Sequence, residues 1–174
     1  LNLLSRVAET YWKKAQVYDT LGDHLNASQN FDIAANNYKS ASEKIPQLKD
    51  FYLDHALYMQ SWSEIEKARH HHEKQEYSLA QEHFEKAAEL HKTLKQWYYL
   101  APNYSAWAQL EFAEDLSRKE KGEEALKTFE QAAELFEQTR KSIQNELDKI
   151  EDSEEKDMAK SMLKATNLRQ QYCI

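Results

Sequence analysis

The feature that most constrains this fold is a short pattern that occurs three times: Ala, then Phe four residues on, then an Ala-Ala pair. The copies read ASQNFDIAANNY, AQEHFEKAAELH and ALKTFEQAAELF, and they begin at Ala27, Ala80 and Ala125. Another alanine stands twelve residues before each copy, at Ala15, Ala68 and Ala113. Small residues let two antiparallel helices approach closely, and a Phe fills the groove beside them. The pattern predicts three helical hairpins with core anchors at Phe31, Phe84 and Phe129.

Composition supports helices throughout. The chain has 174 residues but only two Gly and two Pro, whereas strands need frequent turns built from such residues. We therefore expect an all-α chain. Gly22 and Asp23 predict a helix stop followed by an N-cap. Pro46, Pro102 with a cap at Ser105, and Gly122 are the other expected breaks. About seven helices follow: one before Gly22, then 24–45, 47–74, 76–99, 104–120, 123–151 and a last one to about 171.

These helices predict one domain over residues 1–174. Its repeat units span about 8–45, 47–100 and 103–151, and a capping helix spans 153–172. Asp152 and Glu155 have the spacing of a capping box at the start of that last helix. Met158, Met162 and Leu163 are expected to dock it on the third hairpin. Because the chain starts at Leu1 rather than Met, we expect it to be part of a longer protein.

The repeated spacing resembles the tetratricopeptide repeat, and the first unit matches it best, with Tyr11, Ala15, Tyr18, Ala27, Phe31 and Ala34. Two features depart from that family. The closing proline is replaced by Lys39, Lys92 and Glu137, and the steps between copies are 53 and 45 residues, against about 34 in the family. The resemblance implies an α-solenoid of three long antiparallel hairpins with a C-terminal capping helix. The soluble NSF attachment proteins, which have long helices, are more loosely similar.

The resemblance also implies a function, which is non-enzymatic protein–protein scaffolding. The first helix of each tetratricopeptide unit lines a groove that binds a partner peptide or helix. The corresponding positions in this chain are Trp12, Gln16, Asp19, Ile65, Arg69, His72, Leu110, Glu114 and Arg118. The carboxylate clamp of chaperone-binding members needs Lys and Asn at such positions, which this set lacks, so we do not expect chaperone tails as ligands.

Charge and cysteine usage exclude other classes. A net charge of −7 disfavours binding to nucleic acid and to anionic membranes. No apolar run approaches the roughly 20 residues that span a bilayer, and the single cysteine, Cys173, allows no internal disulfide. We expect a cytoplasmic protein. It is not expected to be an enzyme or to use a cofactor, because it has no Gly-rich phosphate loop and Cys173 stands beside the C-terminus.

The histidines do not have the spacing of a metal site. Consecutive His residues in RHHHEK (69–74) point about 100° apart, and no His has another His four residues away. No His has an acidic residue three positions before it, as a di-iron bundle requires. His70 is expected to pair with Glu66, and His83 and His91 are expected on the charged face. No metal is predicted, although a metal- or ligand-binding bundle stays as a less favoured alternative.

Two aromatic stretches leave alternatives open. The segment 96–107 either locks a turn between two helices or forms a ledge for a partner peptide. The segment 50–62 is more apolar than one buried stripe needs, which indicates burial on two sides or a dimer surface. A structural or oligomerisation module that uses residues 47–62, with a possible homodimer, is therefore the main alternative function.

Overall fold

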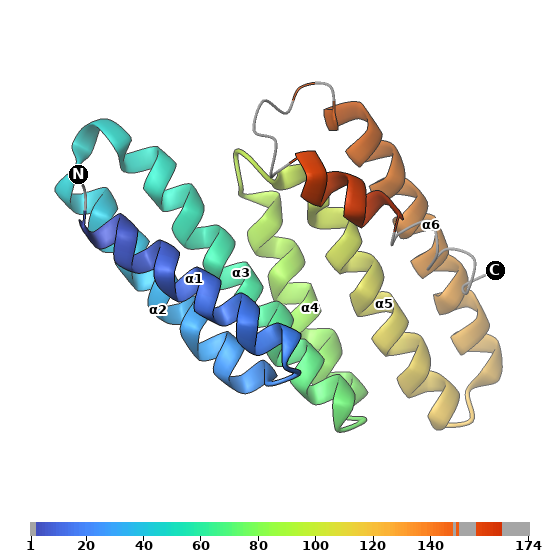
Figure 1. Ribbon diagram of the computed structural model, residues 1–174. Helices are drawn as coiled ribbons and strands as arrows, with labels where there is room; N and C mark the ends of the chain where they lie inside the picture. Colours follow the sequence, from blue (N-terminus) through green and yellow to red (C-terminus); the bar gives the residue numbers. More distant parts are fainter. Residues whose placement is uncertain (1–2, 148, 150–155, 165–174) are drawn as a thin grey trace.

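The computed structural model describes residues 3–147, 149 and 156–164, and every regular element in them is helical (Figure 1). The prediction of an all-α chain is confirmed. The elements are α1 (Leu3–Thr20), α2 (His24–Lys44), η1 (Pro46–Leu48), α3 (Lys49–Glu73), α4 (Tyr77–Lys92), η2 (Tyr98–Leu100), α5 (Ala101–Arg118) and α6 (Gly122–Leu147). A further helical segment covers residues 156–164. In the described part of the chain, no helix is long and apolar enough to cross a membrane.

The main packing contacts join helices that follow one another in the sequence, from α1 with α2 to α5 with α6. Short connections make each pair antiparallel. The nine repeat alanines that the pattern places at the contact points are all buried, as expected: Ala15, Ala27, Ala34, Ala68, Ala80, Ala87, Ala113, Ala125 and Ala132. Because none carries more than a methyl group, the backbones of neighbouring helices approach closely along the whole row.

Three tight turns share one geometry. Gly22, Gln75 and Glu120 each stand five residues before a repeat alanine, and each has a positive φ, of 77°, 61° and 60°. In every turn the next residue's N–H donates to the carbonyl five residues back: Asp23 to Tyr18, Glu76 to His71 and Lys121 to Leu116. These are the hydrogen bonds of a Schellman helix end. The predicted stop at Gly22 and the cap at Asp23, whose side chain accepts from the Asn26 N–H, are confirmed.

Two predicted boundaries are wrong at Pro102 and Gly122. Pro102 lies in the first turn of α5, where its missing N–H costs nothing and its fixed φ suits the helix. It therefore begins a helix rather than breaking one, and Ser105 is not the cap. Gly122 likewise opens α6. The left-handed residue of that turn is Glu120, so the stop comes two residues earlier than a glycine-based prediction places it.

The helix expected over 76–99 ends at Lys92. The reason is a contact from another helix. Asp54 on α3 is buried, and its carboxylate accepts from the backbone N–H groups of Lys95 and Gln96 at 2.8 and 3.1 Å. Those N–H groups leave the helical pattern to hydrogen-bond the buried carboxyl group, and Leu94 and Trp97 turn into the core beside it.

Of the predicted anchors, Phe31 and Phe84 are buried, but Phe129 is only half-buried. Phe31 and Phe84 each have the helix of a following hairpin to pack against. Among the described elements, α6 has no such hairpin after it, and its fully buried aromatic side chain is Phe136, which meets Trp107 edge-on. The expectation that Phe129 anchors the core is therefore wrong.

Candidate functional site

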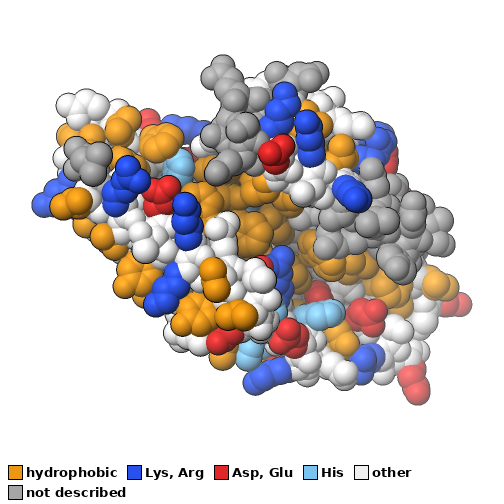
Figure 2. All heavy atoms as spheres, viewed as in Figure 1, with side chains coloured by type: hydrophobic (Ala, Val, Ile, Leu, Met, Phe, Trp, Pro, Cys, Tyr) orange, Lys and Arg blue, Asp and Glu red, His pale blue; other side chains and the backbone are white. Residues whose placement is uncertain are grey.

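A groove of about 540 Å³ opens on the side of the molecule formed mainly by α1, α3 and α5. Figure 2 shows hydrophobic side chains gathered at its floor, in the hollow at the centre of the view. Phe31 from α2 and Phe84 from α4 reach the same floor. The helices α1, α3 and α5 are the first members of the three hairpins, so the groove lies on the face that the resemblance to tetratricopeptide repeats implies.

The floor is built from aromatic pairs. Phe31 stacks on Trp62 with ring centroids 5.8 Å apart, and Phe84 stacks on Trp107 at 5.9 Å. Trp12 from α1 meets Tyr58 of α3 edge-on at 5.9 Å. These rings come from five helices, so the floor joins all three hairpins.

The helical segment 156–164 lies over part of the groove, near the end at which α5 begins (Figure 1). Met158, Ser161 and Met162 face the groove, Ala159 is fully buried, and the Tyr58 hydroxyl donates to the Met158 sulfur at 3.5 Å. Met158 was expected on the third hairpin, whereas it contacts α3 of the second. The remainder of the predicted capping helix, with Asp152 and Glu155, lies outside the described residues.

Six of the nine predicted groove residues line this groove: Trp12, Gln16, Asp19, Ile65, Arg69 and His72. Leu110, Glu114 and Arg118 do not. The groove meets α5 at Asn103, Tyr104, Trp107 and Glu111, so Glu114 and Arg118 lie beyond its end, whereas Leu110 lies between lining positions without lining the groove itself. For two of the missed residues, a signal existed in the sequence. Trp62 and Trp107 both stand six residues before a repeat alanine, Ala68 and Ala113, which marks them as equivalent positions.

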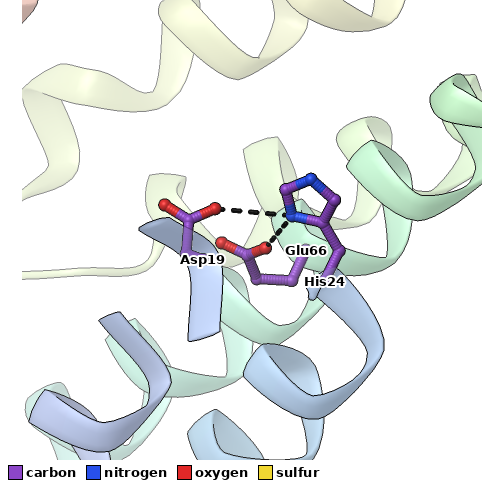
Figure 3. Close-up of side chains that lie close together, drawn as sticks. All are labelled: Asp19, His24 and Glu66. Carbon is purple, nitrogen blue, oxygen red and sulfur yellow. Dashed lines mark hydrogen bonds and ion pairs between the residues drawn. The ribbon is translucent and has the colours of Figure 1, made fainter. Parts of the chain in front are cut away.

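A network of charged and titratable side chains borders the groove where Asp19 and Arg69 line it. Figure 3 shows Asp19 of α1, His24 at the start of α2 and Glu66 of α3 pointing toward one another. Glu66 is fully buried, and its carboxylate lies 2.7 Å from His24 Nδ1 and 3.0 Å from Arg69 Nη1. Glu66 thus pairs with His24 and Arg69, where the sequence had suggested His70. Burial, assisted by the neighbouring Asp19, raises the pKa of Glu66 to about 7, although Arg69 and the hydrogen bond with His24 oppose the shift.

The same three residues form a candidate metal-ligand set, since their ligand atoms all lie within 4.8 Å of one another. Arg69 Nη1, however, donates to Asp19 at 2.8 Å as well as to Glu66. Its guanidinium supplies the positive charge that a metal ion would bring, and an ion would have to displace it. His24 Nε2 also lies 3.0 Å from Glu73. The arrangement is best explained as an ion-pair network that ties α1, α2 and α3 together.

The prediction that His91 lies on the charged face is wrong. His91 is fully buried, its Nδ1 lies 2.5 Å from Ser61 Oγ, and burial lowers its pKa to about 3. The sequence held the signal, because Phe84, Ala87, Ala88 and His91 follow the spacing of one helix face. His83 is half-buried and pairs with Glu64 at 2.6 Å.

On the α5 wall, two buried polar residues have oxygens without donors. Asn103 and Glu111 are each 3 % exposed, and nothing in the described part of the chain donates to Asn103 Oδ1 or Glu111 Oε2. The other Glu111 oxygen lies 2.6 Å from His72 Nδ1, and this contact raises the pKa of His72. A groove with an apolar floor and a few unsatisfied polar groups on its wall is suited to binding a ligand.

The aromatic stretches fit mainly structural roles. In 50–62, Tyr52, Tyr58 and Met59 are buried, which confirms burial on two sides, while Phe51 is half-exposed. In 96–107, Trp97 stacks on Tyr58 with centroids 3.9 Å apart, and Trp107 belongs to the groove floor.

Comparisons with protein-family models, with curated proteins and with solved structures found no match to this chain. The groove and its residues therefore stand on the geometry alone.

Proposed function

We propose that this protein is a non-enzymatic scaffold built as a tetratricopeptide-like stack of three hairpins, and that it binds an amphipathic helix of a partner protein in the groove. The three equivalent turns at Gly22, Gln75 and Glu120 and the row of buried alanines support the repeat architecture. Fold does not determine function, so the groove itself has to carry the functional argument.

The observation that carries the proposal is the chain's own helical segment over the groove. Residues 156–164 present Met158 and Met162, four positions apart, to the aromatic floor. Helix-in-groove recognition uses apolar anchors at this spacing, and methionine adapts well to such surfaces. The segment covers only part of the groove, and the end near Arg69, His72 and Glu111 provides room for a longer or different helix.

A photo-crosslinking residue placed in the full chain, in its native cell, tests the proposal. Gln16 is exposed at the groove, and Gln131 is equally an exposed glutamine but lies on α6, which lines no part of the groove in the described residues. We expect a partner that crosslinks at position 16 and not at 131. The crosslinked segment, once purified, should bind wild type and should bind the Trp62→Ala variant at least about tenfold more weakly. Identical crosslinks from both positions would contradict the proposal.

A further inference from the structure

Glu111 is the most deeply buried acidic side chain that lines the groove. It is 3 % exposed, whereas the Asp19 side chain is 33 % exposed. One Glu111 oxygen has a donor, the Nδ1 of His72 at 2.6 Å, and no described residue donates to the other. A buried carboxylate oxygen without a donor is costly, so this site lacks one hydrogen bond that a ligand could supply.

The present donor, His72, is easily replaced. Its side chain is 53 % exposed, and it offers Glu111 a single N–H. A guanidinium presents two parallel N–H groups and matches both oxygens of one carboxylate, which is stronger and more directional than one bond from an imidazole. An incoming arginine can therefore exchange one hydrogen bond to Glu111 for two while His72 turns toward solvent.

The charges near His72 also favour a cation. Glu111, Glu114 and Glu73 all act electrostatically on His72. The one basic side chain of α5, Arg118, is engaged elsewhere: its guanidinium carbon lies 4.9 Å from the Tyr77 ring centre, and Nη1 donates to Gln75 at 3.0 Å. Arg69, at the same end, pairs with Asp19 and Glu66 at 2.8 and 3.0 Å, so neither arginine pairs with Glu111.

The floor beside Glu111 suits the stem of a long basic side chain. Trp107 stands one helical turn before Glu111 on α5 and lines the same groove. Indole rings attract cations and pack well against methylene groups. The chain's own segment over the groove is also basic, since residues 156–164 contain three lysines and one aspartate.

From these contacts we infer that the groove accepts a basic side chain of the partner, arginine above all, with its guanidinium on both oxygens of Glu111 and its stem against Trp107. This inference rests on the proposed function, since it specifies the chemistry of the helix that the groove binds. It predicts that the partner helix carries an arginine or lysine beyond its apolar anchors, on the side that meets α5.

A small-molecule titration of the ¹⁵N-labelled full chain tests the site without a partner. N-butylguanidinium is the probe, N-butylurea is its uncharged counterpart of the same shape, and the indole N–H signal of Trp107 reports binding. We expect the guanidinium to bind at least about tenfold more tightly than the urea. Glu111→Gln should remove that preference. Glu130→Gln, which deletes an exposed charge on α6, should leave it unchanged.

A second variant keeps Glu111 intact. His72→Ala removes the resident donor, so guanidinium binding should tighten by several-fold. Equal binding of the two probes, or a preference that survives Glu111→Gln in a variant that melts like wild type, would overturn the inference. Because the probes need no partner, a failed titration together with specific crosslinks at position 16 overturns this inference alone. A titration that succeeds, together with identical crosslinks from positions 16 and 131, overturns the proposed function alone.

Discussion

Phe31 on α2 stacks on Trp62 of α3 with ring centroids 5.8 Å apart and planes inclined by 23°, and Phe84 on α4 repeats this contact with Trp107 of α5 at 5.9 Å and 22°. In both cases the Phe is the repeat anchor of one hairpin, and the Trp belongs to the first helix of the next. The contact thus connects neighbouring hairpins and at the same time forms the floor of the groove. A change in this pair affects both stability and the binding surface.

The equivalent Phe residues provide a matched test of that role. Phe84→Ala should lower the free energy of unfolding by about 3 to 5 kcal/mol, because it opens a cavity beneath Trp107. Phe129→Ala should cost about 1 to 2 kcal/mol, because that ring is already half-exposed. Denaturant titration of both variants measures the difference. Equal losses at the two positions would show that the stacked pair adds nothing.

Because the turns at Glu120 and Gly22 share one geometry, substitutions at these two positions should change the stability of the fold in opposite directions. Glu120 has a φ of 60°, which favours glycine, so Glu120→Gly should stabilise the fold by about 1 kcal/mol. Gly22 has a φ of 77° and open space around it, so Gly22→Ala should destabilise by a similar amount through the backbone alone. Thermal unfolding of the two variants measures both effects, and a destabilised Glu120→Gly would contradict the assignment of that turn.

The buried Glu66 makes stability depend on pH. Its pKa is raised to about 7 in the folded protein, from an ordinary value of 4.5. Between these values the folded state holds a proton that the unfolded state has lost, so stability falls as pH rises from about 4.5 to 7. Glu66→Gln removes this titrating group. The free energy of unfolding of the variant, relative to that of wild type, should therefore rise by about 2 to 3 kcal/mol from pH 5 to pH 8.

Denaturant titrations of wild type and Glu66→Gln at the two pH values test this dependence. Comparing the variants, rather than wild type alone, removes the contribution of other groups, including the buried His91. A stability difference that stays the same at pH 5 and pH 8 would show that Glu66 is already ionised throughout this range.

The sequence was most informative where structure is local. The alanine spacing identified the close contacts between helices, and Gly22 with Asp23 identified a helix end, because both depend on a few neighbouring residues. The helix end at Glu120 could not be predicted, because its left-handed conformation is imposed on a residue that does not favour it. The end of α4 could not be predicted either, because it depends on Asp54, which is about 40 positions away in the sequence.

The groove was predictable in part for the same reason. Positions on α1 and α3 followed from the repeat, whereas the α5 residues depend on how far the groove extends along that helix. The location of segment 156–164 depends on tertiary packing, so Met158 was placed on the wrong hairpin. Glu111 could not be singled out, because its importance comes from burial and from an oxygen without a donor.

Binding of an amphipathic helix in the groove is tested most directly by one competition measurement. A fluorescent peptide with the sequence of residues 153–172 is titrated with wild type and with the full-length Met158→Gln/Met162→Gln variant, whose own segment binds the groove weakly. The peptide should bind the variant, and wild type at least about tenfold more weakly, because wild type's own helix occupies the groove. A control peptide with both methionines replaced by glutamine should bind neither. No binding to the variant, or equal binding to both proteins, would contradict the account.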